Sequence, residues 1–181
     1  MRSLRDDAEV MLTTWRPVSA DQLQLRDAYL AFIAQHDDAL SRTCRIGHLT
    51  ASALVMSENR EQVLLTLHPK VGRWLQLGGH IELGDDSVRE AAQREVIEEC
   101  GLQPTWLSAM PVRLDRHAVP CGGSRSEHLD VQFLALVDPE AAVQISDESL
   151  DLRWFLVGEL PMDIDASVRA LVADAARVTR T

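Results

Sequence analysis

The segment Ser87–Cys100 constrains the fold of this chain more than any other part of the sequence. Ser87 has the chemistry of a helix N-cap, and Glu90, three residues later, completes the pattern of a capping box. Gly101 stands where a left-handed C-cap residue is expected, and Pro104 follows at a spacing typical of a helix end. The segment is therefore predicted to form one helix between these caps.

The predicted helix carries acids on the face that should point inward. On a helical wheel at about 100° per residue, Glu95, Glu98 and Glu99 fall within an arc of about 100°. The same arc holds or borders the small apolar residues of the segment, which are Val88, Ala91 and Ala92. Glu95 and Glu99 are like charges at positions i and i+4, and partial burial raises the cost of their repulsion unless a cation is present.

Converging carboxylates of this kind suit a hard cation such as Mg²⁺ or Mn²⁺, which prefers oxygen ligands. Arg94 lies at the edge of the cluster, where it could hold a carboxylate by a bidentate contact. A solvent-exposed acidic helix face is the alternative, and the wheel alone favours it, because most charge runs are of that kind. The residues around the helix change that balance.

The acids of the chain are concentrated around this helix. The 181 residues contain 18 Lys and Arg against 28 Asp and Glu, which gives a net charge of −10. From Glu82 to Glu99, seven acids stand against two arginines, so this segment alone carries −5. The acidic balance argues against binding of a nucleic-acid polymer or an anionic membrane surface. An anionic small molecule is compatible with it if a divalent metal ion supplies positive charge.

Length and composition indicate a globular protein of about one domain. Hydrophobic residues make up 46% of the chain and charged residues 25%, and the length is enough to bury a core. No apolar run approaches the ~18 residues of a membrane helix, and the N-terminal residues lack the apolar stretch of a secretory signal. The three cysteines are odd in number and widely spaced, which favours reduced thiols. We therefore expect a cytoplasmic protein.

The order of the expected elements predicts an α/β fold in which helices cover a mixed β-sheet. Residues 1–43 are expected to form an N-terminal helical extension, with a capping box at Ser19–Gln22 and apolar residues at helical intervals up to about Leu40. Residues 44–181 are expected to form the main domain, which closes with a helix over Asp165–Val178. Its strand-like segments are 48–56, 62–68, 74–77, 80–83, 106–114, 129–137 and 152–157, with a polar connection at 121–126.

The run from Gly78 to Leu102 resembles the signature of the Nudix hydrolase superfamily. In that signature a glycine is followed after five residues by Glu, and seven residues later by Arg-Glu, an aliphatic residue, any residue, Glu-Glu, any residue, glycine and an aliphatic residue. Residues 94–102, REVIEECGL, match the second half without a gap. The first half is one residue longer, so the early acid is Asp85 when counted from the glycines and Asp86 when counted from the arginine. The additional residue is expected in the loop before the helix, where an insertion costs little.

The resemblance implies an α/β/α sandwich and a metal-dependent hydrolase that cleaves a diphosphate bond in a nucleoside diphosphate linked to another group. By position, Glu95 and Glu99 are similar to direct ligands of Mg²⁺ or Mn²⁺, and the Gly78 carbonyl to the backbone oxygen that completes the metal shell. Glu98 is similar to a ligand or to the base that takes a proton from water, and Arg94 to the residue that orients the glutamates. Metal ions neutralise a polyanionic diphosphate and acidify bound water, and a general base adds ~10²–10⁴-fold.

An acid in the loop before the last strand is a second candidate for catalysis. In many members of the family an acid in this region reaches the metals or acts as the base. Glu148 is favoured over Asp147 for this role, and an exposed acid in a polar loop is the alternative.

Further polar residues could line a substrate site. Arg73 and His80 flank the start of the signature and could contact phosphate. If the strands around the Gly122-Gly123 loop pair, His117, His128 and Asp130 approach the same cleft. A zinc site that includes Cys121 fits no standard ligand spacing, so pocket-lining or loop hydrogen bonding is favoured for these residues.

A nucleotide-binding or regulatory module without turnover is the rival hypothesis. The intact glutamate cluster argues against it, because a pure binder has little reason to hold so costly an arrangement. The N-terminal helices could cover the sheet, gate the site or form a homodimer interface, and their sequence leaves these roles open.

Overall fold

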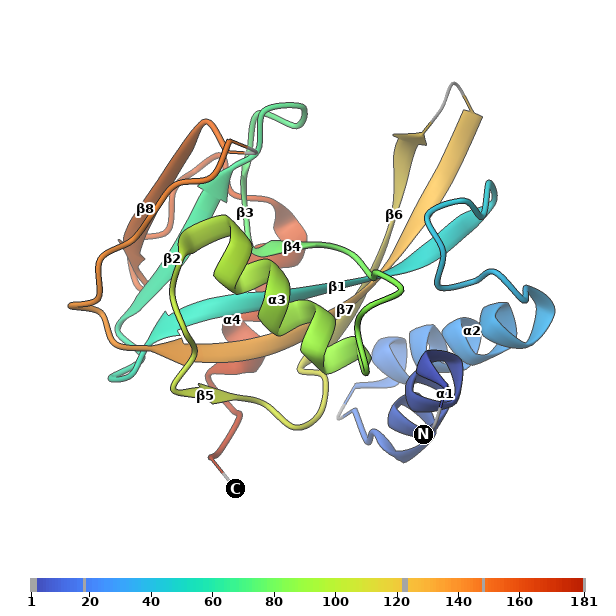
Figure 1. Ribbon diagram of the computed structural model, residues 1–181. Coiled ribbons are helices and arrows are strands. Elements are labelled where there is room, and N and C mark those ends of the chain that lie inside the picture. Colours follow the sequence, from blue (N-terminus) through green and yellow to red (C-terminus); the bar gives the residue numbers. More distant parts are fainter. Residues whose placement is uncertain (1–2, 18, 122–123, 148, 181) are drawn as a thin grey trace.

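Two long strands run side by side through the centre of a mixed β-sheet (Figure 1). The computed structural model describes residues 3–17, 19–121, 124–147 and 149–180. Strand β1 (Gly47–Ser57) pairs in parallel with β7 (Ser124–Val137), in a register that runs from Gly47 opposite Glu127 to Ser57 opposite Val137. The remaining strands pair antiparallel with their neighbours; they are β2 (Gln62–Leu67), β3 (Trp74–Leu75), β4 (Leu77–His80), β5 (Trp106–Leu107), β6 (Arg113–Cys121) and β8 (Asp151–Leu156).

Helices cover both faces of this sheet, which confirms the predicted sandwich (Figure 1). Side chains alternate between the faces of a strand, so each central strand supplies two cores. Leu49, Ala51 and Val55 of β1 pack in one core with helix α3 and the two N-terminal helices. Leu54 and Met56 of the same strand pack in the other core with α4. The helices are α1 (Leu4–Thr14), α2 (Ala20–Gln35), α3 (Val88–Cys100) and α4 (Ala166–Ala175).

The face that α4 covers is apolar only over part of its length. The residues of β1 and β7 that continue this face away from α4 are His48, Thr50, Ser52, His128, Asp130 and Gln132, here called the polar face. All of them except His128 are buried. Polar side chains at buried positions of central strands require partners or a ligand, since an unpaired buried polar group is costly. The polar face is therefore the part of the sheet where function is expected.

The two N-terminal helices dock on the sheet. Gln22 of α2 accepts a hydrogen bond from the Leu114 backbone N–H (2.7 Å) and donates to the Leu114 carbonyl (3.0 Å). The hydroxyl of Tyr29 donates to the backbone carbonyls of Asp115 (2.6 Å) and Asp130 (3.2 Å). Of the roles considered from the sequence, covering the sheet is the one that these contacts describe. In the described part of the chain, no helix has the length and apolarity needed to cross a bilayer.

The start and end of α2 differ from the sequence prediction. The side chain of Ser19 makes no cap hydrogen bond, and the side chain of Gln22, its expected capping-box partner, is engaged with the backbone of β6. The helix ends at Gln35 and does not reach Leu40. The acids that follow, Asp37 and Asp38, would sit unfavourably at the negative end of a longer helix dipole.

Strand bounds were wrong at four places. The segment 74–77 is divided between β3 and β4, which pair with different strands. The segment 106–114 is broken, because Pro111 lies between β5 and β6. The segment 80–83 is not a strand: β4 ends at His80, and a turn follows in which the Asp85 carboxylate accepts from the Glu82 N–H (2.8 Å). The polar connection expected at 121–126 belongs mostly to a hairpin, since Cys121 pairs with Ser124 across a tip that lies outside the described residues.

Candidate active site

The helix that carries the acids forms where its caps predict. The Ser87 hydroxyl accepts from the Glu90 N–H (3.0 Å), and Gly101 adopts a left-handed conformation with φ of 71°. The Gly101 N–H closes the last turn by donating to the Ile97 carbonyl (2.8 Å). The capping box is only half formed, because the Glu90 carboxylate accepts from the Asp86 N–H (3.0 Å) and not from that of Ser87.

Glu95 and Glu99 point inward, toward the glycine pair of β4. Their residues are 9% and 7% exposed, so the acidic face is not a solvated one. The Gly78 N–H donates to a carboxylate oxygen of Glu99 at 2.6 Å. A Cβ at Gly79 would lie 2.8 Å from each carboxylate oxygen of Glu95, closer than real Cβ contacts allow. The missing side chain at this position therefore lets the helix and the strand approach each other.

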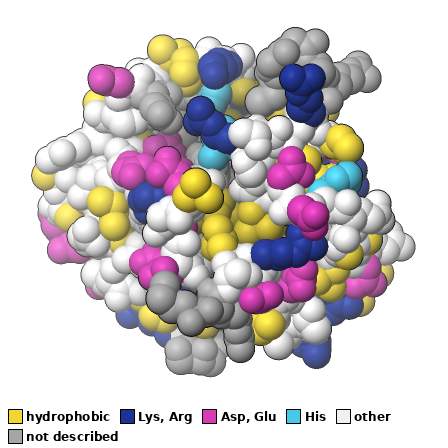
Figure 2. All heavy atoms as spheres, turned by 45° about the vertical axis from the view of Figure 1, so that its right-hand side comes forward, with side chains coloured by type: hydrophobic (Ala, Val, Ile, Leu, Met, Phe, Trp, Pro, Cys, Tyr) yellow, Lys and Arg dark blue, Asp and Glu magenta, His cyan; other side chains and the backbone are white. Residues whose placement is uncertain are grey.

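Arg94 joins the acids around this point into one network. Its guanidinium donates to both carboxylate oxygens of Asp85 (2.9 and 3.0 Å), to Glu95 (2.9 Å) and to Glu98 (3.0 Å). It also donates to the His80 carbonyl at 2.9 Å. The hydrogen bond with Asp85 is the main reason why the pKa of Arg94 is raised further above its ordinary value. On the face of the molecule drawn in Figure 2, acidic side chains lie in groups, and basic side chains lie next to them.

Of the two acids that could stand at the early acid position of the signature, Asp85 is the one that lies next to Arg94. Asp85 is 8% exposed and bonded to Arg94, whereas Asp86 is exposed. Burial by itself would raise the pKa of Asp85, but the bonds from Arg94 and the Glu82 N–H hold it below its ordinary value. The turn over residues 82–86 therefore accommodates the additional residue and still delivers an acid to the arginine.

The donor set at the helix fits a hard divalent cation. One guanidinium charge faces the carboxylates of Asp85, Glu95 and Glu98, and Glu99 adds a further acid beside Gly78. Glu98 is the exposed member, with 57% of its side chain accessible, so it lies at the edge toward solvent. Clustered carboxylate oxygens are what Mg²⁺ and Mn²⁺ bind.

The comparison with known families agrees with this geometry. Residues 47–175 match the NUDIX domain. The chain belongs to the Nudix family. Helices α1 and α2 precede the matched region.

Solved Nudix structures share the fold. A NUDIX family hydrolase from Clostridium perfringens superposes with a TM-score of 0.59 at 24% identity, covering 71% of this chain and 95% of that one. The NUDIX domain of Shewanella oneidensis NrtR complexed with ADP ribose gives 0.56 at 20% identity, over 81% of this chain and 95% of that one. A C. elegans Ap4A hydrolase binary complex gives 0.53 at 19% identity, over 71% and 94%. No curated protein shows a significant match.

Histidines gather on the polar face, close to the Nudix glycine pair. The ring centroids of His48, His80 and His128 lie 4.8 to 5.4 Å from one another, and that of His117 lies 5.5 Å from His128. Burial, together with the neighbouring histidines, lowers the pKa of His128 to about 3. Burial and then His80 lower the pKa of His48. The pKa of His117 is raised, chiefly because its Nδ1 bonds the Asp115 carboxylate at 2.8 Å.

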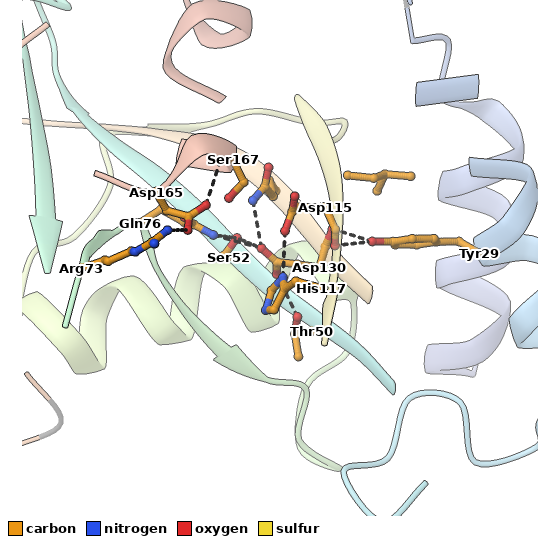
Figure 3. A network of polar contacts seen from close by, with 12 residues as sticks. Tyr29, Thr50, Ser52, Arg73, Gln76, Asp115, His117, Asp130, Asp165 and Ser167 are labelled. Atoms are coloured by element: carbon orange, nitrogen blue, oxygen red, sulfur yellow. Dashed lines mark hydrogen bonds and ion pairs between the residues drawn. The ribbon is translucent and has the colours of Figure 1, made fainter. Parts of the chain in front are cut away.

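Asp130 is the hub of a buried network on the same face (Figure 3). Its carboxylate accepts hydrogen bonds from Thr50 (2.9 Å), Ser52 (2.6 Å), Gln76 (3.1 Å) and Gln132 (3.1 Å). Burial raises the pKa of Asp130, and the hydrogen bonds oppose that shift. The network fixes the side chains that lie between the histidines and the apolar part of the face.

The remaining candidates from the sequence make other contacts or lie outside the described residues. Arg73 forms an ion pair with Asp165 (3.2 Å), whose carboxylate caps α4 through the Ser167 N–H (Figure 3). Asp147 is exposed. Glu148 lies outside the described residues, as does the side chain of Cys121.

The sequence pointed to the acids of the signature helix, which lie around Arg94 and the glycine pair, and it did not point to His48. Glu95, Glu98, Glu99 and Arg94 are visible in the sequence because they share one helix. His48 meets His128 only through the parallel pairing of β1 and β7, which joins residues far apart along the chain. The available signal was its place two residues before Thr50, on the same face of a predicted strand.

Proposed function

We propose that this Nudix chain is a metal-dependent pyrophosphohydrolase that cleaves a diphosphate bond in a nucleotide or a nucleoside diphosphate-linked small molecule. The observation that supports it is the burial of Glu95 and Glu99 against the glycine pair of β4, with Arg94 tying Glu95 to Glu98. Buried carboxylates of like charge are costly without a cation. A divalent ion would remove that cost and supply the chemistry.

The acids divide into ligands and base. Glu95 and Glu99, with the Gly78 carbonyl, would hold Mg²⁺ or Mn²⁺. When bound, the ion neutralises the diphosphate and favours in-line attack by water. Glu98 is proposed to accept the proton of the attacking water. Its carboxylate is exposed to solvent, and its bond to Arg94 keeps it near the buried Glu95 and Glu99. As the water oxygen bonds to phosphorus, the bridging P–O bond breaks and the second phosphate leaves.

Water is the expected nucleophile because the described thiols are unsuited to the task. Cys44 and Cys100 are buried. Burial raises the pKa of Cys100 to about 11, so this thiol stays protonated at neutral pH. A thiol that is not ionised is a poor nucleophile.

A nucleotide substrate is the proposed class. Among proteins of the same fold, one is an Ap4A hydrolase and another is a NUDIX domain complexed with ADP ribose. His117 is exposed, and its bond to the Asp115 carboxylate raises its pKa; contact of this imidazole with a substrate phosphate stays a prediction. Contacts of substrate with Arg73, His80, His128 and Asp130, and a catalytic role for Glu148, stay predictions.

The test is turnover of a panel of nucleoside di- and triphosphates, ADP-ribose, sugar nucleotides and dinucleoside polyphosphates with Mg²⁺ or Mn²⁺. Glu98→Gln is expected to lower turnover by ~10²–10⁴-fold, the usual contribution of a general base. Glu99→Gln should weaken metal binding as well, because it removes a proposed ligand. Glu90→Gln is the matched control, since it changes an acid in the first turn of the same helix and keeps an oxygen for the Asp86 N–H.

Two results would contradict the proposal. Undiminished turnover in Glu98→Gln and Glu99→Gln would place the chemistry elsewhere. Tight nucleotide binding without product release across the panel would favour the non-catalytic binding module.

A further inference from the structure

Three histidines from three adjacent strands converge on the polar face. His80 ends β4, His48 lies at the start of β1, and His128 pairs with His48 across the β1–β7 ladder. A ligand-capable atom from each of the three lies within 4.8 Å of the other two. His48 is buried, and His80 and His128 are partly exposed, so the group has one closed side and one side open to solvent.

The hydrogen bonding of His48 is incomplete in a way that points to a ligand. Its residue is 1% exposed, yet neither Nδ1 nor Nε2 makes a hydrogen bond within the protein. The backbone of Cys44 lies near the ring and acts to raise its pKa, as a weak hydrogen-bond partner does, but the contact falls outside hydrogen-bond geometry. The buried Nε2 of His128 is likewise without a partner. Buried polar atoms are nearly always satisfied, so atoms left over at one place indicate an ion or a water between them.

The chemistry of the three side chains decides in favour of an ion. Neutral imidazole nitrogens are the preferred protein ligands of Zn²⁺, and three histidines are a complete protein ligand set for a zinc site that keeps one open position. Nitrogens that bind zinc at about 2.0–2.1 Å lie about 3.4 Å from one another in a tetrahedral site. The observed spacing of up to 4.8 Å is wider than this value, so the three side chains would have to move closer together to bind one ion.

We infer that His48, His80 and His128 form a binding site for Zn²⁺, separate from the carboxylate site on α3. Thr50 pairs with His80 and Ala51 with Gly79, so His80 belongs to the polar face while Gly79 faces Glu95. The two sites therefore lie on opposite faces of β4 and use different ligand types, nitrogen in one and oxygen in the other. The fourth position of the zinc, on the side open to solvent, is available to water or to an anionic ligand.

Zinc at this site would bind β4, β1 and β7 together beside the glycine pair. The His80 carbonyl accepts a hydrogen bond from Arg94, so the residue that ligates on one face is attached to the acidic network on the other. The inference does not depend on hydrolysis, because it rests only on the histidines. The chain should bind zinc whether or not it turns over nucleotides.

The test is titration of the full chain with Zn²⁺ in the presence of excess Mg²⁺, which occupies oxygen sites. About one equivalent is expected to bind, and the imidazole nitrogen resonances of His48, His80 and His128 should shift in a long-range ¹H–¹⁵N spectrum. Substitution of Co²⁺ should give the intense visible absorption of a tetrahedral nitrogen site. His128→Gln and His80→Gln should each weaken binding by at least about tenfold, since even loss of an outer partner has an effect of that size.

The controls separate this site from other metal-binding groups. His68→Gln changes a histidine whose ring accepts hydrogen bonds in the turn before β3, so it should bind zinc as the wild type does. Glu99→Gln should also bind normally, which keeps the test independent of the carboxylate site. Comparable melting temperatures without metal would show that the histidine variants are folded.

Three results would overturn the inference. They are no zinc uptake in excess Mg²⁺, unchanged affinity in His128→Gln and His80→Gln, or resonance shifts confined to His36. His36, with Asp38 and Cys44, is another group with ligand atoms close together, so the last result would move zinc to the end of α2.

Discussion

Arg94 organises the candidate active site at the scale of single residues. Its guanidinium contacts three carboxylates and a backbone carbonyl, and therefore fixes the positions of α3, the preceding turn and the end of β4 at once. A lysine could not reproduce these contacts, because only the planar guanidinium offers donors in several fixed directions. The effect of a single substitution near Arg94 on stability or metal binding therefore depends on which of these contacts it removes.

Asp85→Asn is expected to destabilise the fold, whereas Asp86→Asn should have little effect. Asp85 is buried and makes charge-assisted hydrogen bonds with Arg94, so its neutralisation should cost about 1.5–3 kcal/mol. Asp86 is exposed and serves as the matched control. Urea unfolding at neutral pH measures the difference. Equal stability of the two variants would show that the arginine does not depend on Asp85.

The same contact gives a pH dependence. The pKa of Asp85 is lower in the folded chain than its ordinary value of 3.8, so its contribution to stability is present above that value. It is lost as the pH falls through the folded-state pKa. The stability gap between the wild type and Asp85→Asn should therefore narrow in acid.

Gly79→Ala should weaken metal binding. The added Cβ would lie 2.8 Å from both carboxylate oxygens of Glu95, so the carboxylate must move. We expect affinity for Mn²⁺ to fall by about tenfold or more, measured by calorimetry. Gly84→Ala is the control, because a Cβ at Gly84 meets nothing within 4 Å. Unchanged affinity in Gly79→Ala would mean that Glu95 is not a ligand.

At the scale of elements, α3 depends on its C-cap. Gly101 has φ of 71°, and a Cβ there would also lie 3.2 Å from Gln144. Gly101→Ala is expected to lower the free energy of unfolding by about 1 kcal/mol, measured by urea denaturation. Gly158→Ala, where a Cβ has free space and no positive φ is required, should leave stability near that of the wild type. Equal losses in both variants would contradict the role of the cap.

Local signals in the sequence, such as capping residues and helical periodicity, predicted α3 well. They could not predict which strands pair with one another. Ser87, Gly101 and the inward acids all belong to one helix, and within a helix the separation of two residues in the sequence determines how far apart they lie in space. The β6–β7 hairpin extends through a segment whose polarity suggested a loop, because each strand is stabilised by pairing with the other. The meeting of His48, His80 and His128 was not predicted for the same reason, since these residues come together through two strand pairings, β1–β4 and β1–β7.

At the scale of the whole molecule, the N-terminal helices share one core with the sheet. Leu12, Tyr29 and Ile33 are fully buried in the same cluster as Leu49 and Leu129 of the central strands. The helices are therefore docked through apolar contacts as well as through the Gln22 and Tyr29 hydrogen bonds. A division of the chain after residue 43 stays a prediction, and its two parts share this core.

The docking can be followed through Tyr29, the single tyrosine of the chain. Burial raises its pKa well above the ordinary value of 10.0, and the charges of Asp130 and Asp115 add to the shift. In an alkaline titration, phenolate absorbance should be absent near pH 10 and appear only as the chain unfolds. Burial of the neutral phenol favours the folded state below pH 10, and this contribution is lost at higher pH.

The control is the chain unfolded in denaturant, in which the phenol of Tyr29 should ionise near its ordinary pKa of 10.0. Phenolate absorbance near that pH with an unchanged circular dichroism spectrum would contradict the docked arrangement of α2.

The turn between His80 and Asp85 has a consequence for recognising relatives of this chain. Arg94 of α3 donates hydrogen bonds to His80 at one end of the turn and to Asp85 at the other. The number of residues between these two ends can therefore vary while both contacts are kept. A motif search with rigid spacing would overlook proteins built in this way. A search keyed to an arginine with a partner acid upstream, and tolerant of length in between, would retrieve them.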